Sequence, residues 1–216
     1  QDQATVSLEL GNLKFSFTCS NGLFSGTGDL SSLSEGTYTA QLSSTPSGAS
    51  STTTIFRDDT KPASPTALNS SAFVASLASG PVISWTDATD NLSGIDHYEV
   101  RLLKDSDSSE IALWTVLASG GALGSVSLIQ AQFYHYQVRA VDKAGNISDA
   151  SDGSAFKPDT TAPTPNFWYS QVYQSRAASA AFSPEYSWVP YEDTLSGVDH
   201  YEVSLGTFSG GTDLMN

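Results

Sequence analysis

The eight residues from Ser93 to Val100, SGIDHYEV, return almost unchanged as SGVDHYEV from Ser196 to Val203. Trp85 recurs as Trp188 at the same offset of 103 residues. A repeat of about a hundred residues is too long for the unit of a solenoid and matches a β-sandwich domain used repeatedly along a chain. The sequence therefore predicts an array of similar modules rather than one large domain.

Two proline-containing joints divide the chain at nearly the same spacing. Both follow the pattern Asp-x-Thr-x-Pro, from Asp58 to Pro62 and, 101 residues later, from Asp159 to Pro163. Proline fixes its own φ and drives the preceding residue towards extended conformations, so we expect short, stiff linkers. The predicted modules are a partial one over residues 1–57, a complete one over 61–158 and a truncated one over 162–216.

Alternation of apolar and polar residues marks the strands of the middle module. It is clearest in residues 97–102 and 134–141, where one face of each strand carries apolar side chains: Tyr98, Val100, Leu102, Tyr134, Tyr136, Val138 and Ala140. Further strands are expected at 82–85, 111–116, 125–129 and 155–157. No useful window has helical periodicity, so we predict an all-β fold.

Several of these features together carry a family resemblance. Trp85 on an early strand, the stretch from Tyr136 to Asn146 (YQVRAVDKAGN) and the joint from Asp159 to Pro163 resemble the fibronectin type III and related immunoglobulin-like repeats of bacterial surface and secreted proteins. The resemblance covers residues 61–216 well and residues 1–57 more weakly. It implies tandem immunoglobulin-like (fibronectin type III-like) β-sandwich modules. The last segment stops before any counterpart of the Tyr136 strand, so we expect that the natural chain continues or that another chain completes the sheet.

Charge and cysteine content limit the partners. Nine Lys and Arg against 23 Asp and Glu give a net charge of −14, which repels nucleic acid and anionic membranes and attracts cations. We expect no nucleic-acid partner. We also expect no membrane insertion, because no apolar run approaches the roughly 20 residues that span a bilayer. The one cysteine, Cys19, excludes an intrachain disulfide, and we interpret it as a small buried strand residue, with an intermolecular disulfide as the alternative.

The sequence offers no catalytic constellation. Its three histidines are His97, His135 and His200, and the first and last occupy the same repeat position on the polar face of a strand. A residue that recurs at the same position of each repeat is more often part of the fold than part of a functional site. There is no G-x-S-x-G, no H-E-x-x-H, no phosphate-binding glycine loop and no cysteine pair. We therefore expect a protein without enzymatic activity.

Acidic and amide side chains concentrate where the first joint should meet two loops. In such a sandwich, the loops after the Trp strand and after the Tyr strand lie at the pole where the chain enters from the previous module. We predict that this pole gathers a set of oxygen ligands: Asp58, Asp59, Asp87, Asp90, Asn91, Asp96, Asp142 and Asn146. Calcium takes about six to eight such oxygens, and it would offset the repulsion between the carboxylates while stiffening the joint.

The second joint offers a smaller set of candidate calcium ligands: Asp159, Glu192, Asp193 and Asp199. Pro190 stands where the middle module has Asp87, and the second loop is missing. The first segment has Ser and Thr instead, from Ser43 to Gly48, so we predict no site at its far end. The alternative for both joints is that Asp and Asn simply form turns and keep the surface soluble.

Aromatic residues are dense between Phe167 and Tyr173. Flat rings stack on the apolar faces of pyranose sugars, so Trp168, Tyr169 and Tyr173 are candidate ligand-binding residues. Phe167 and Tyr169 alternate with Trp168, as in a strand that contributes to a core, and core or interface packing is the alternative.

Taken together, these features predict a non-enzymatic, extracellular spacer in a bacterial surface adhesin or secreted protein. It would reach a cell-surface polysaccharide or protein through regions outside this sequence, and its unpaired strand edges would allow self-association. Two alternatives stay open: a module that itself binds carbohydrate or a host protein, and accessory modules of a secreted hydrolase. The spacer predicts buried indoles at Trp85, Trp168 and Trp188, whereas a binding module predicts rings that face solvent.

Overall fold

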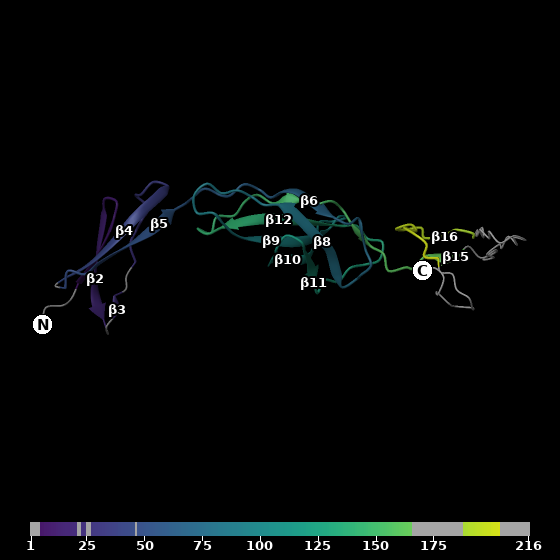
Figure 1. Cartoon of the computed structure of the whole chain (residues 1–216), viewed down its shortest axis with the longest axis horizontal. Helices are drawn as coiled ribbons and strands as arrows, with labels where there is room; N and C mark the ends of the chain where they lie inside the picture. Colours follow the sequence, from purple (N-terminus) through teal and green to yellow (C-terminus); the bar gives the residue numbers. More distant parts are fainter. Residues whose placement is uncertain (1–4, 21–22, 25–26, 46, 166–187, 204–216) are drawn as a thin grey trace, which may run out of the picture.

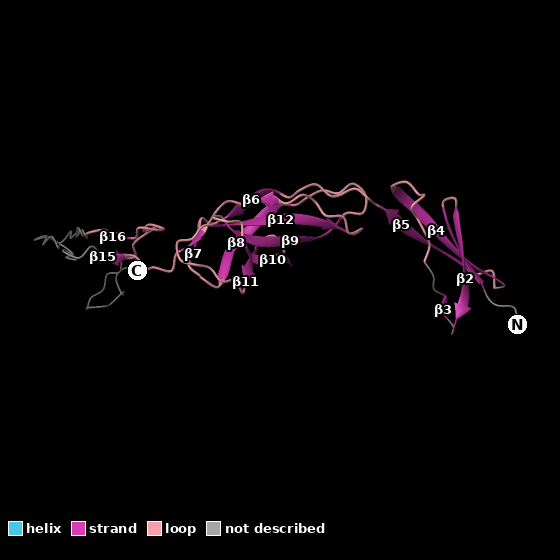
Figure 2. Cartoon of the chain, turned by 180° about the vertical axis from the view of Figure 1, so that it is seen from behind, coloured by secondary structure: helices cyan, strands magenta, loops and turns pink. Residues whose placement is uncertain are grey.

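The computed structural model describes residues 5–20, 23–24, 27–45, 47–165 and 188–203. These residues form strands, turns and loops, and no helix is present among them. Figure 1 shows the sheets following one another along the long axis of the chain, and Figure 2 shows the same strands from behind. The described part therefore holds no helix long and apolar enough to cross a membrane. The predicted all-β fold is confirmed.

The described residues up to Arg57 form one antiparallel sheet of five strands in the order β3-β2-β1-β4-β5. Its strands are β1 (Thr5–Leu10), β2 (Leu13–Ser20), β3 (Leu23–Phe24), β4 (Gly36–Thr45) and β5 (Ser50–Arg57). Gly11 has a φ of 59°, which suits the tight turn between β1 and β2. A small core of Leu10, Leu33 and Ala40 covers one face of this sheet. Cys19 lies in β2, as predicted, opposite Phe24 of β3.

Residues 66–158 form two principal sheets and a short parallel pair. One sheet has the order β10-β9-β12-β13, another has β11-β8-β6, and β14 pairs with β7. The strands are β6 (Thr66–Ser70), β7 (Phe73–Val74), β8 (Ser79–Thr86), β9 (Ile95–Lys104), β10 (Glu110–Val116), β11 (Gly121–Gly124), β12 (Tyr134–Asp142), β13 (Ser151–Asp152) and β14 (Lys157–Pro158).

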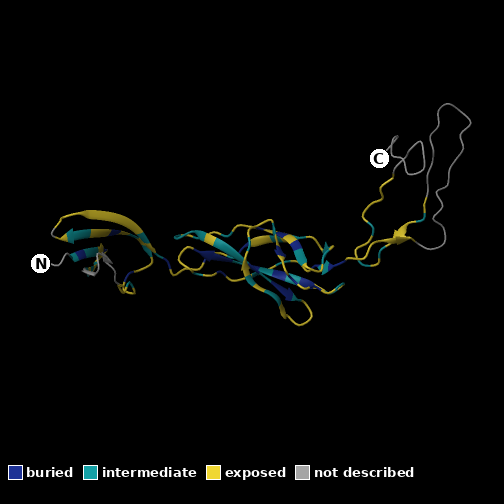
Figure 3. Ribbon diagram, turned by 90° about the horizontal axis from the view of Figure 1, so that it is seen from below, coloured by how far each residue is buried: buried dark blue, intermediate teal, exposed yellow. Residues whose placement is uncertain are grey.

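The core of this middle part lies between β8, β9 and β12. Its buried members are Ile83, Trp85, Val100, Leu102, Leu123, Val126, Leu128, Tyr134, Tyr136, Val138 and Phe156. Buried positions alternate with exposed ones along β8 and with partly buried ones along most of β12, and Figure 3 colours the chain by this burial. The alternation read from the sequence is confirmed, because Val100 and Leu102 of β9 are buried together with Tyr134, Tyr136, Val138 and Ala140 of β12.

The predicted strand at residues 125–129 is wrong. Ser125 has a φ of 56°, which interrupts extended backbone, and the strand of this region is β11, which ends at Gly124. Val126 and Leu128 still enter the core, and their backbone N–H groups donate to Ala78 and Leu77 at 3.2 and 2.9 Å. The sequence pattern therefore identified buried positions but assigned them the wrong backbone.

In the third segment, β15 (Thr164–Pro165) pairs with β16 (Tyr191–Glu192). The Trp188 and Tyr201 rings lie 5.4 Å apart at 58°, which repeats the arrangement of Trp85 and Tyr98 at 5.2 Å and 58°. The environment differs, because Trp85 is 7% exposed and Trp188 is 41% exposed. The prediction of a buried indole is confirmed at Trp85 and wrong at Trp188.

Candidate cation site at the first joint

The first joint begins with a buried aspartate directly after β5. Asp58 is 7% exposed, and its Oδ1 accepts a hydrogen bond from the backbone N–H of Thr60 at 3.1 Å. Its Oδ2 accepts from the backbone N–H of Ser93 at 3.0 Å, in the loop between β8 and β9. Burial raises the pKa of Asp58, but the hydrogen bonds from Ser93 and Thr60 outweigh it and hold the pKa below its ordinary value. The carboxylate thus ties the joint to the module that follows.

A second aspartate reaches the joint from the end of β12. Asp142 is 2% exposed, and its Oδ1 accepts from the backbone N–H groups of Ala144 and Asn146 at 2.9 and 2.8 Å. The side-chain amide of Asn146 donates to Asp142 Oδ2 and to the backbone oxygen of Asp58, at 2.9 Å in each case. Asn146 therefore connects the turn after β12 to the backbone of the joint.

The third aspartate comes from the loop between β8 and β9. Oδ2 of Asp90 accepts from the backbone N–H groups of Leu92 and Gly94 at 3.0 and 2.7 Å. Its other oxygen, Oδ1, is shielded from solvent and has no hydrogen-bond partner. A shielded carboxylate oxygen without a partner is costly, because its desolvation is not compensated.

The three carboxylates converge at the pole of the middle module. One oxygen from each of Asp58, Asp90 and Asp142 lies within 4.8 Å of the other two. No lysine or arginine in the described part of the chain forms an ion pair with any of them. Backbone N–H groups and the Asn146 amide donate to these carboxylates, in a place where their mutual repulsion is weakly screened.

The other four residues predicted for this site lie outside the group: Asp59, Asp87, Asn91 and Asp96. Asp59 forms an ion pair with Arg57 at 2.7 Å, and Asp96 contacts His97 Nδ1 at 2.7 Å. The remaining two are exposed in the loop that carries Asp90. The structure thus brings together three of the predicted carboxylates and the Asn146 amide.

The second joint repeats the first aspartate contact. Asp159 is 7% exposed, and its Oδ1 accepts from Thr161 N at 3.0 Å while its Oδ2 accepts from Ser196 N at 3.1 Å. The hydrogen bonds from Thr161 and Ser196 lower the pKa of Asp159. Gln130 also donates to Asp159 Oδ1 at 2.9 Å and accepts from Thr160 N at 3.0 Å. Sequence reasoning missed Gln130, because no repeat position or motif marks it.

The remaining acidic residues of the second joint do not gather into a comparable group among the described residues. Oδ1 of Asp193 accepts from Leu195, Ser196 and Gly197 N–H groups, much as Asp90 does in the middle module. Glu192 belongs to β16. Asp199 contacts His200 Nδ1 at 2.8 Å and raises the pKa of that histidine.

The candidate sugar-stacking residues Trp168, Tyr169 and Tyr173 lie outside the described residues. Whether they face solvent or a core therefore stays a prediction.

The solved structures that are similar to this chain include three multidomain segments. The FN1–FN3 domains of chicken CNTN1 have a TM-score of 0.39 and 18% identity, over 72% of this chain and 56% of that one. A multidomain segment of titin has a TM-score of 0.39 and 16% identity, over 74% and 56%. A segment of two fibronectin type III domains from chicken tenascin has a TM-score of 0.35 and 16% identity, over 72% and 84%.

The match thus spans little more than half of the CNTN1 and titin segments. No family model and no curated protein matches the sequence. The described chain is all-β, and residues 66–158 form the fibronectin type III-like, two-sheet arrangement that the sequence predicted, as their own antiparallel sheets and shared core show.

Proposed function

We propose that this chain is a non-enzymatic spacer of tandem β-sandwich modules in a bacterial surface or secreted protein, acting outside the cell. The observation that carries the proposal is the contact made by the first residue of each joint. Asp58 and Asp159 each accept a hydrogen bond from the backbone N–H at the same position of the following repeat, Ser93 and Ser196. A joint built in this way restricts the rotation of one module against the next.

Other contacts support the same role at the first joint. Asn146 donates to the backbone oxygen of Asp58, and Lys61 pairs with Asp149 at 2.7 Å. The backbone N–H of Ala63 also donates to Thr89 O at 2.9 Å. The linker is thus held by loops on several sides, in addition to the stiffness that Pro62 gives it. The elongated arrangement in Figure 1 suits a chain that holds a partner-binding region away from an anchor.

The proposal includes a calcium ion at the first joint, held by Asp58, Asp90 and Asp142. Two oxygens bound to one calcium at about 2.4 Å each lie no more than about 4.8 Å apart, and the three carboxylates meet this limit. Asp90 Oδ1, which has no other partner, would gain one. The ion would link the linker, the loop after β8 and the end of β12, and so stiffen the joint.

The experiment that tests the spacer measures the distance between two parts of the chain. The exposed residues Thr39 of β4 and Leu113 of β10 are each replaced by cysteine and spin-labelled. A Cys19→Ser background ensures that only these two sites react. We expect a single narrow distance distribution that broadens in Asp58→Ala, because the contact to Ser93 is lost. The exposed neighbour substitution Asp59→Ala is the matched control and should leave it narrow. A broad distribution in the parent protein would contradict the spacer.

A further inference from the structure

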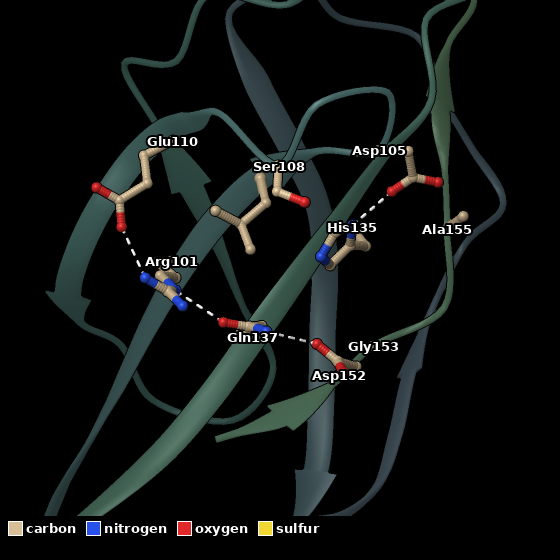
Figure 4. Close-up of a pocket in the computed structure, with 10 residues that line it drawn as sticks. Arg101, Asp105, Ser108, Glu110, His135, Gln137, Asp152, Gly153 and Ala155 are labelled. Carbon is tan, nitrogen blue, oxygen red and sulfur yellow. Dashed lines mark hydrogen bonds and ion pairs between the residues drawn. The ribbon is translucent and has the colours of Figure 1, made fainter. Parts of the chain in front are cut away.

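A row of planar polar side chains crosses the outer face of the sheet β10-β9-β12-β13 (Figure 4). Arg101 contacts Glu110 at 2.7 Å through Nη1 and donates to Gln137 Oε1 at 2.7 Å through Nε. The Gln137 amide donates in turn to Asp152 Oδ1 at 2.6 Å. Strand register produces this row, because Gln137 lies opposite Arg101 on β9 and opposite Asp152 on β13. Each of the four strands contributes one member.

The row lines an open groove of about 680 Å³. A second pair, His135 and Asp105, lies beside the row and also lines the groove, with a hydrogen bond between His135 Nδ1 and Asp105 Oδ1. Figure 4 shows the two sets of side chains facing the same space. The groove therefore has a polar lining whose groups are held in place by one another.

Each of these side chains keeps unused hydrogen-bonding capacity. Glu110, Asp105 and Asp152 each use one carboxylate oxygen in the contacts above, and no described residue contacts the other oxygen. His135 Nε2 is likewise without a partner in the described part of the chain. Planar groups that are oriented before a ligand arrives lose little conformational entropy on binding it.

From this lining we infer that the groove binds a neutral oligosaccharide. The groove offers acceptors, the three carboxylates, next to donors, the guanidinium of Arg101 and the amide of Gln137. Sugar hydroxyls donate and accept at once, so they match this mixture. An acidic sugar would be repelled by the three carboxylates, and an ammonium group, although the carboxylates attract it, cannot accept hydrogen bonds from Arg101 and Gln137.

An aromatic ring supports the arginine of the row. The Arg101 guanidinium lies 4.7 Å from the centre of the Trp114 ring, and Arg139 lies 4.1 Å from it. Trp114 lies on β10, is partly buried and does not line the groove itself. This stacking restricts the Arg101 guanidinium to the orientation in which it meets Glu110 and Gln137, so the row is further ordered before a ligand arrives.

The test screens the protein against a printed array of neutral, acidic and amino-sugar oligosaccharides, followed by calorimetric titration with the neutral oligosaccharide that binds. We expect selective retention of neutral oligosaccharides, and roughly tenfold weaker binding in Asp152→Asn and Glu110→Gln, which keep side-chain shape. The control is Glu99→Gln, which lies on the same face but pairs with Arg139 at 2.6 Å and does not line the groove.

Thermal melts of all three variants establish that each is folded, so that a loss of affinity reports the groove. Binding to no neutral oligosaccharide, preference for acidic or amino sugars, or an equal loss in Glu99→Gln would overturn the assignment. Because the groove lies on the middle module and not at a joint, these results are independent of the spacer proposal.

Discussion

At the scale of single residues, the aspartate that opens each joint acts as an acceptor for backbone N–H groups. Asp58 binds Thr60 N and Ser93 N, and Asp159 binds the corresponding Thr161 N and Ser196 N. These bonds favour the ionised carboxylate, which is why both pKa values are lowered. An aspartate here does what an asparagine would do less well, because charge-assisted hydrogen bonds are stronger than neutral ones.

The lowered pKa of Asp58 predicts a pH dependence of stability. A carboxyl whose folded-state pKa lies below its unfolded value contributes stability above the unfolded value, near 3.8. That contribution is lost as the pH falls through the lower, folded-state pKa. In melting curves recorded as a function of pH, Asp58→Asn should melt below the parent at pH 6, and the gap should close below about 3.8. Asp59→Asn serves as the control, and a gap that persists in acid would contradict the assignment.

At the scale of elements, the alternation along β9 and β12 decides which side chains build the core. Leu102 of β9 is 1% exposed, whereas Leu113 of the neighbouring β10 is 70% exposed. Leu102→Ala should therefore lower the free energy of unfolding by about 2–5 kcal/mol through lost burial and a cavity. Leu113→Ala, the same chemical change on an exposed site, should change it by less than about 0.5 kcal/mol. Denaturant unfolding measures both, and equal effects would show that β9 is not the centre of this core.

The sequence was enough to predict these strands and their buried faces, because side-chain periodicity is a local property of the chain. Period-two alternation identified β9 and β12 and the side of each that is buried. It failed at residues 125–129, because the positive φ of Ser125 leaves no trace in hydrophobic pattern. It also failed at Trp188, where duplication of the indole did not bring the same burial.

The candidate cation site shows the same limit. Loop composition named eight residues at the first joint, and the structure groups the carboxylates of Asp58, Asp90 and Asp142. The choice depends on turns within the loop after β8, where Gly94 has a φ of 79° and Asp90 folds back onto the Leu92 and Gly94 N–H groups. Sequence composition does not encode that geometry. The groove on the outer sheet face could not be predicted from the sequence either, because it depends on the register between strands.

At the scale of the whole molecule, the first joint carries side chains from the linker and from the module that follows it. Asp58 belongs to the linker, whereas Asp90 lies in a loop of the middle module and Asp142 at the end of its strand β12. A cation bound by all three contributes to folding and to the fixed orientation of the joint together. Such a cation would bind only the folded state, because the three segments are far apart in sequence and meet only after folding.

Melting the protein with calcium and with chelator measures this contribution. Millimolar calcium at a micromolar site should add about 4 kcal/mol to the free energy of unfolding. Asp90→Asn keeps an oxygen for the Leu92 and Gly94 N–H groups but loses the charge, so it should abolish most of the calcium-dependent shift. Asp96→Asn, in the same loop but paired with His97, should keep the shift. A melting temperature that calcium does not change would exclude the cation. The hydrogen bond from Ser93 N–H to Asp58 would then remain as the contact that orients the joint, because the N–H donors alone would be enough to hold the three carboxylates together.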